Sequence, residues 1–133
     1  MNPQKEPVLT QSLRDMIGVE QKFIQDSASL TELLGEGLKE LQLHPDEPTR
    51  VSYRNDVYSL LFGCQEPVYV SVWIRPTSRF VHVNCFSTYE AVSSKMVCEK
   101  LEEIFEPTIS YPIDRQMPTD PSYVLLRPKL RQS

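Results

Sequence analysis

The chain has 133 residues, of which 40% are hydrophobic and 24% charged, a balance that is typical of one folded domain and excludes wholesale disorder. Its 14 basic and 18 acidic residues give a net charge of −4 without any basic cluster, so nucleic acid is not an expected partner. No apolar stretch approaches the roughly 20 residues of a membrane span, and residues 1–7 lack the apolar segment of a signal peptide, so we expect no membrane association and a cytoplasmic location.

The first half of the chain is expected to form a strand, a helix and two further strands. The strand over 9–13 precedes the helix, whose start is predicted by the capping-box pattern Ser29-Leu30-Thr31-Glu32. Behind this pattern, leucines recur at helical spacing and define one buried face. Short extended runs over 50–53 and 57–62 predict the next two strands.

The stretch over 68–86 is expected to form a β-hairpin whose two faces differ in chemistry, with its turn at 75–79. The period-two alternation places on one face a set of residues that needs a core: Val68, Val70, Val72, Ile74, Val81, Val83 and Cys85. Pairing of like faces predicts that Trp73 lies opposite His82 and that Ser71 lies opposite Asn84. The candidate ligand-binding residues share this other face: Trp73, His82, Ser71, Asn84 and Tyr69.

A second helix is expected after the capping-box pattern Ser87-Thr88-Tyr89-Glu90, and Pro107 ends it. A strand over 108–113 then precedes a proline-rich segment without periodicity. Antiparallel strands grouped around two helices predict an α+β fold, a two-layer α/β sandwich with a mainly antiparallel sheet and both helices on one face. The expected organisation is an N-terminal extension, a single domain and an extended C-terminal tail, over 1–7, 8–116 and 117–133.

The polar-aromatic face of the hairpin has two interpretations. Trp73 could stack on a purine while His82 hydrogen-bonds it, since aromatic faces suit nucleobases and imidazole offers a donor or an acceptor. Alternatively, the face packs against a second sheet or a partner subunit, as aromatic strand faces commonly do. Because such a face is too apolar to remain in water, we expect a homodimer that covers it.

The three cysteines, Cys64, Cys85 and Cys98, are odd in number and lack CxxC spacing, which disfavours both a disulfide framework and a zinc site. With only His44 and His82 to assist them, no metal site is expected. We expect three reduced and buried thiols. Cys85 is not assigned as a nucleophile, because the alternation points it away from His82.

Several local patterns occur in the order found in one enzyme family. The run from Leu13 to Val19 leads into the leucine-rich helix, 59–66 ends at Glu66, and 80–87 forms a later strand. In these features the chain resembles, over approximately 9–112, the bacterial type of S-adenosylmethionine decarboxylase, a pyruvoyl enzyme of polyamine synthesis. The resemblance implies the sandwich fold, a homodimer with sheet-on-sheet pairing, and a ligand of the S-adenosylmethionine or polyamine type.

The chain departs from that family at the position where the family processes itself. The family cleaves its chain between a glutamate and a serine, and the serine becomes the pyruvoyl group that accepts electrons during decarboxylation. Here Glu66 is followed by Pro67 and Val68, neither of which has a hydroxyl that can attack the preceding carbonyl. The comparison therefore predicts no pyruvoyl cofactor, no assigned catalytic residue, and a degenerate processing site at Glu66 and Pro67.

The leading hypothesis is a non-catalytic relative of the decarboxylase that binds a small ligand or a protein partner through the Trp73 face and is linked to polyamine metabolism. One alternative is an active decarboxylase, or another enzyme, that uses Tyr69, Ser71, His82 and Asn84. A second alternative is a plain protein-interaction module.

Overall fold

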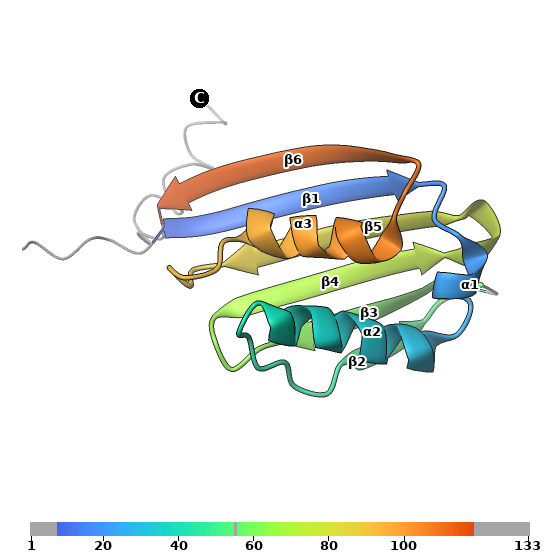
Figure 1. The fold of residues 1–133 in the computed structure, drawn as a ribbon, viewed down its shortest axis with the longest axis horizontal. Coiled ribbons are helices and arrows are strands. Elements are labelled where there is room, and N and C mark those ends of the chain that lie inside the picture. Colours follow the sequence, from blue (N-terminus) through green and yellow to red (C-terminus); the bar gives the residue numbers. More distant parts are fainter. Residues whose placement is uncertain (1–7, 55, 119–133) are drawn as a thin grey trace, which may run out of the picture.

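A computed structural model of the chain describes residues 8–54 and 56–118. Its elements are, in chain order, β1 (Val8–Ile17), α1 (Gln21–Ile24), α2 (Ser27–Glu40), β2 (Thr49–Ser52), β3 (Tyr58–Gly63), β4 (Val68–Arg75), the 3-10 turn η1 (Pro76–Ser78), β5 (Phe80–Ser87), α3 (Ser94–Phe105) and β6 (Ile109–Pro118). The six strands form one antiparallel sheet in the order β2-β3-β4-β5-β1-β6, and the helices lie on one face of it (Figure 1). This arrangement confirms the predicted α+β two-layer sandwich.

The central β4–β5 hairpin has the register that alternation predicts. Trp73 pairs with His82 and Ser71 pairs with Asn84. Every residue assigned to the core face is buried beneath the helices: Val68, Val70, Val72, Ile74, Val81, Val83 and Cys85. At the turn, Arg79 takes a left-handed conformation with φ of 54°, which reverses the chain between the two strands.

The two long helices cover the core face and contact each other. Their apolar sides bury leucines, a valine and a phenylalanine against the sheet: Leu30, Leu34, Leu38, Val97, Leu101 and Phe105. At the crossing of α2 and α3, a Cβ atom on Gly37 would lie 2.5 Å from Ile104 Cδ1. Gly37 therefore permits the close approach of the helices, whereas Gly35 faces open space.

The first long helix begins two residues before the predicted capping serine. Its N-cap is Asp26, whose side chain accepts a hydrogen bond from the Ala28 amide at 3.0 Å. Ser29 lies inside the first turn and donates its hydroxyl proton to the same carboxylate at 2.8 Å. Asp26, further upstream, thus takes the role that the pattern at 29–32 assigned to Ser29.

The N-cap of α3 also differs from the prediction, by six residues. Ser93 caps the helix and accepts a hydrogen bond from the Met96 amide. Ser87 instead ends β5, and its hydroxyl donates to the Val92 carbonyl oxygen at 2.6 Å while it accepts from the Tyr89 amide at 3.0 Å. The capping-box pattern is used to fold the loop between strand and helix, not to begin the helix.

The neighbouring strands β1 and β6 extend further than the short apolar runs predict, because they pair along their full length. Ile17 pairs with Ile109 at one end, and Val8 pairs with Pro118 at the other. Met117 and Pro118, expected in the tail, therefore belong to the sheet. A proline is tolerated there because β6 is an edge strand with one neighbour. The remaining tail over 119–133 and the extension over 1–7 lie outside the described residues.

The charged side chain of Arg14 is buried between the sheet and the helices. The side chain of Arg14 is 3% exposed, and its Nη1 donates to Asp114 Oδ1 at 2.8 Å and to the Leu13 carbonyl oxygen at 2.9 Å. Its Nε lies 3.4 Å from Glu102 Oε2 without a hydrogen-bond geometry. Arg14 on β1 thus ties together the edge strand β6 and the helix α3.

Within the part of the chain that the structure describes, no helix is long and apolar enough to cross a membrane.

Candidate functional site

The helices cover one face of the sheet, and no element within residues 8–54 and 56–118 covers the other (Figure 1). We call this second surface the open face. By strand alternation and register, it carries exposed large apolar residues from four strands: Ile17, Leu61, Tyr69, Trp73, Ile109, Tyr111 and Ile113. Monomeric proteins rarely leave so extended an apolar surface in water.

All five residues predicted to bind a ligand lie together on the open face. Trp73 and His82 form one cross-strand pair, Ser71 and Asn84 form the next, and Tyr69 follows opposite Phe86. Trp73 and Tyr69 are 41% and 59% exposed, whereas Ser71 and Asn84 are half-buried between their neighbours. The open face therefore combines exposed aromatic rings, Trp73 and Tyr69, with the less exposed hydrogen-bonding groups of Ser71 and Asn84.

Asp15 is a member of this site that the sequence analysis missed. It lies on β1 directly opposite His82, and its Oδ1 is 2.6 Å from His82 Nδ1. The predicted strand ended at Leu13, so Asp15 was outside any expected element. The signal was nevertheless present, because the alternation of Leu13, Asp15 and Ile17 continues the open-face pattern of β1.

Tyr53 is the second residue that was missed. It follows β2, and its ring meets the Trp73 ring edge-on, with centroids 5.2 Å apart and an interplanar angle of 63°. Its hydroxyl lies 3.4 Å from Ser59 Oγ. The Trp73 indole is thus flanked by Tyr53 and paired across strands with His82.

Glu66 and Pro67, the predicted degenerate processing site, lie in the loop between β3 and β4. The Glu66 carboxylate accepts a hydrogen bond from the His44 amide at 2.9 Å and lies 2.6 Å from His44 Nδ1. These hydrogen bonds lower the pKa of Glu66. The Pro67 carbonyl oxygen accepts from the Thr88 amide at 3.1 Å. The junction is therefore a hydrogen-bonded turn whose carboxylate is engaged by His44.

The three cysteines are buried, as the sequence predicts. Burial raises the pKa of Cys64 to about 11 and that of Cys98 to about 12, and it raises the pKa of Cys85 further. All three thiols stay protonated near neutral pH, and Cys85 lies on the core face away from His82. The described residues contain no group of three or more His, Cys, Asp or Glu side chains that could hold a metal ion.

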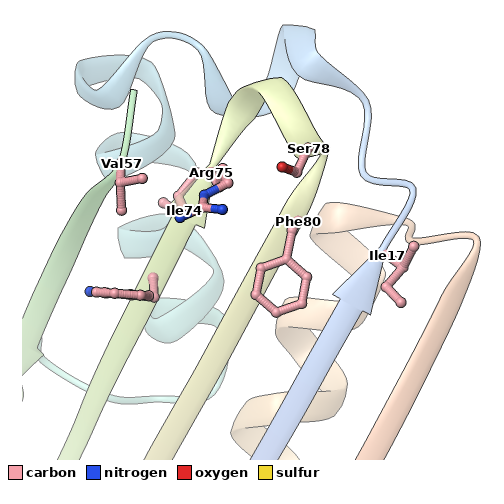
Figure 2. A pocket seen from close by; sticks show the side chains of 7 residues that line it. Ile17, Val57, Ile74, Arg75, Ser78 and Phe80 are labelled. Carbon is pink, nitrogen blue, oxygen red and sulfur yellow. The ribbon is translucent and has the colours of Figure 1, made fainter. Parts of the chain in front are cut away.

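Two depressions lie on the open face. One, of about 400 Å³, includes Tyr69, Ser71 and Asn84 in its lining. The other, of about 430 Å³, lies at the opposite end of β4 and has Trp73 and Phe80 in its lining. Figure 2 shows Phe80 at this cavity. Both volumes fall within the range of small-molecule sites.

No protein-family model and no curated protein matches the chain. Among solved structures, the fold is similar to the crystal structure of the adenosylmethionine decarboxylase from Aquifex aeolicus VF5, with a TM-score of 0.70. The match covers 84% of this chain and 91% of that chain at 12% sequence identity. At this identity the likeness concerns the fold.

Proposed function

We propose that this chain is a non-processing relative of the bacterial type of S-adenosylmethionine decarboxylase that works as a homodimeric binding protein. The observation that carries the proposal is the sequence Glu66-Pro67-Val68 at the start of β4. Self-cleavage by acyl shift needs a hydroxyl or thiol on the residue after the scissile bond, and Pro67 has neither. Without that step, no pyruvoyl group can form at this junction.

The proposed binding surface is the open face. Six strands at about 4.8 Å spacing and eight-residue strands at about 3.4 Å per residue give a face of roughly 29 by 27 Å, or about 800 Å². Two copies that cover each other would bury about 1,600 Å², the size of a standard stable interface. We therefore propose that a second copy of the chain covers the open face outside the ligand site.

The proposed ligand is a cation of the S-adenosylmethionine or polyamine type. The Trp73 indole and the Tyr53 ring offer aromatic faces to a sulfonium or ammonium group, and the half-exposed Asp15 carboxylate lies one residue pair away. Ser71 and Asn84 supply hydrogen-bonding groups in the neighbouring row. The chemistry of the site thus fits the ligand class that the family resemblance implies.

Intact-mass measurement tests the processing step. We expect one species of full length, with the mass of an unmodified chain. Two fragments that meet at the Glu66–Pro67 junction, or decarboxylation of S-adenosylmethionine that carbonyl reagents block, would overturn the non-processing assignment.

Calorimetric titration with S-adenosylmethionine and with spermidine tests the ligand class. We expect saturable binding that Trp73→Leu and Asp15→Asn each weaken. Glu99→Gln removes the same charge as Asp15→Asn on the exposed side of α3, and it should leave the affinity unchanged. Absence of binding by both compounds would reject the ligand class and favour the plain interaction module.

The His82–Asp15 pair supports a second candidate function, an enzyme that uses the open face. A carboxylate 2.6 Å from Nδ1 fixes the imidazole orientation, and this leaves Nε2 available to a substrate as a general base. Mass spectrometry of S-adenosylmethionine incubated with the protein tests this function. A product that wild type forms and His82→Gln does not would favour the enzyme, whereas recovery of the unchanged compound favours the binding protein.

A further inference from the structure

The larger depression on the open face lies where β4 turns into β5, at the end of β4 remote from Glu66. Its lining includes Ile17, Val57, Trp73, Arg75, Ser78 and Phe80. Figure 2 shows Val57 on one side, Phe80 and Ile17 on the other, and Arg75 and Ser78 at the turn between them. The cavity therefore has apolar walls and a polar, positively charged end.

Arg75 supplies the charge at that end. Among the described residues, its exposed guanidinium makes no hydrogen bond and no ion pair. Asp56 lies near enough to interact electrostatically with Arg75, but its carboxylate is held by the amide and hydroxyl of Thr77. A planar guanidinium with free donors beside an apolar cavity is the group that carboxylates bind in bidentate geometry.

The turn that carries these groups is fixed by contacts outside the cavity. The Arg79 Nε donates to the Val19 carbonyl oxygen at 3.1 Å, and the amides of Gly18 and Val19 donate to the Arg79 carbonyl oxygen at 3.0 and 3.1 Å. Gln21 Nε2 donates to the Pro76 carbonyl oxygen at 3.1 Å. Because these bonds fasten the turn to the segment after β1, the cavity walls are formed before any ligand arrives, which reduces the entropic cost of binding.

We infer that this cavity is a binding site for a small carboxylic acid with an apolar body, held by Arg75 and packed between Trp73 and Phe80. The carboxylate accepts hydrogen bonds from the guanidinium, with the Ser78 hydroxyl as a further donor at the same end. The apolar body displaces water from the surface of Trp73, Phe80 and Ile17. One chain forms the whole lining of the cavity, and neither the homodimer nor the cationic ligand is needed to form it. Trp73 also belongs to both of those proposed surfaces, so a bound carboxylic acid should compete with them for the indole.

Calorimetric titration with 3-phenylpropanoate tests the site, with 3-phenylpropanamide and 3-phenylpropylamine as neutral and cationic analogues. We expect the carboxylate to bind most tightly and the amine least. Trp73 is the only tryptophan in the chain, so its fluorescence should report the same saturation. Failure of the carboxylate to saturate either signal, or equal binding of all three compounds, would overturn the inference.

Three variants separate the role of Arg75 from general electrostatics. Arg75→Gln should weaken 3-phenylpropanoate binding by about tenfold or more, as loss of a charge-assisted hydrogen bond predicts, and should leave the amide affinity within about twofold. Arg115→Gln removes an exposed charge from the same face outside this cavity and should leave both affinities unchanged. Phe80→Ala should weaken both compounds alike. Equal losses for Arg75→Gln and Arg115→Gln would show only non-specific attraction and would contradict the site. Light scattering of the same samples reports self-association separately.

Discussion

Arg14 is a charged residue in a buried position, although arginine side chains are usually exposed to water. An arginine that is almost completely buried must have its charge balanced, and Asp114 and Glu102 perform this role from two different elements. Burial acts to lower the pKa of Arg14, but the hydrogen bond with Asp114 and the electrostatic attraction of its neighbours, Asp114 and Glu102 among them, together outweigh it, so the pKa is raised. Arg14 therefore remains charged, and its contacts with Asp114 and Glu102 hold β6 and α3 against β1.

The first prediction concerns removal of this charge. Arg14→Met should reduce the free energy of unfolding by about 2 kcal/mol, because it deprives Asp114 and Glu102 of their partner while filling most of the space. Urea unfolding measures the loss. Arg115→Gln, on the neighbouring exposed position of β6, serves as the control and should remain within about 0.5 kcal/mol of wild type. Equal stability of Arg14→Met and wild type would contradict the structural role.

The second prediction concerns the pH dependence that Asp114 confers. Burial acts to raise the pKa of Asp114, but hydrogen bonds with Arg14 and Ser12 outweigh it and hold the pKa below the ordinary value of 3.8. A depressed carboxyl pKa stabilises the folded state above that ordinary value, and the contribution is lost as the pH falls through the folded pKa. Asp114→Asn should therefore be less stable than wild type at pH 7, and the difference should shrink towards pH 2. A difference that stays constant from pH 7 to pH 2 would contradict this assignment.

At the scale of elements, the sequence predicts best where one physical rule acts alone. The hairpin register followed from alternation, since a slip by one residue would expose Val72 and bury Trp73. The helix starts were wrong where a serine has two possible partners, as at Ser87, because a local pattern does not reveal which backbone group the hydroxyl meets. Asp15 was missed for a related reason: its strand is defined by pairing with residues that are remote in sequence.

The third prediction concerns the crossing of α2 and α3. Gly37→Ala should gain clearly less stability than Gly35→Ala, because the added methyl group meets Ile104 Cδ1 and the shift of that side chain offsets the gain in helix propensity. Gly35→Ala, in the same helix but facing open space, should raise stability by up to about 1 kcal/mol. Chemical denaturation of the matched pair measures both effects. Equal stabilisation by Gly37→Ala and Gly35→Ala would show that the helices do not meet there.

At the scale of the whole molecule, the two faces of the sheet have different roles: one stabilises the fold and the other carries the proposed binding surface. Its core face, with both long helices, buries the apolar residues that stabilise the fold. Its open face carries the proposed ligand groups and the exposed aromatic residues, and a change there removes little buried area. Substitutions on the open face should therefore alter binding and assembly without preventing folding.

The fourth prediction follows from this separation. Light scattering of the wild-type protein should give about twice the chain mass of 15.4 kDa at micromolar concentration. Trp73→Glu should shift the mass to that of one chain, because it places a charge in the apolar centre of the proposed interface. Circular dichroism should show that the variant keeps its fold. A wild-type protein that is monomeric under these conditions would reject the homodimer.

The position of β1 in the sheet has a consequence for the synthesis of the protein on the ribosome. β1 emerges first but is sandwiched between β5 and β6, and Thr10 hydrogen-bonds Ser87 across a separation of 77 residues. At about 5–20 residues per second, translation of that interval takes roughly 4–15 s. During this time the nascent β1 has both edges unpaired. Completion of the sheet must await the later strands, so the emerging N-terminal half exposes an unpaired strand edge that favours aggregation.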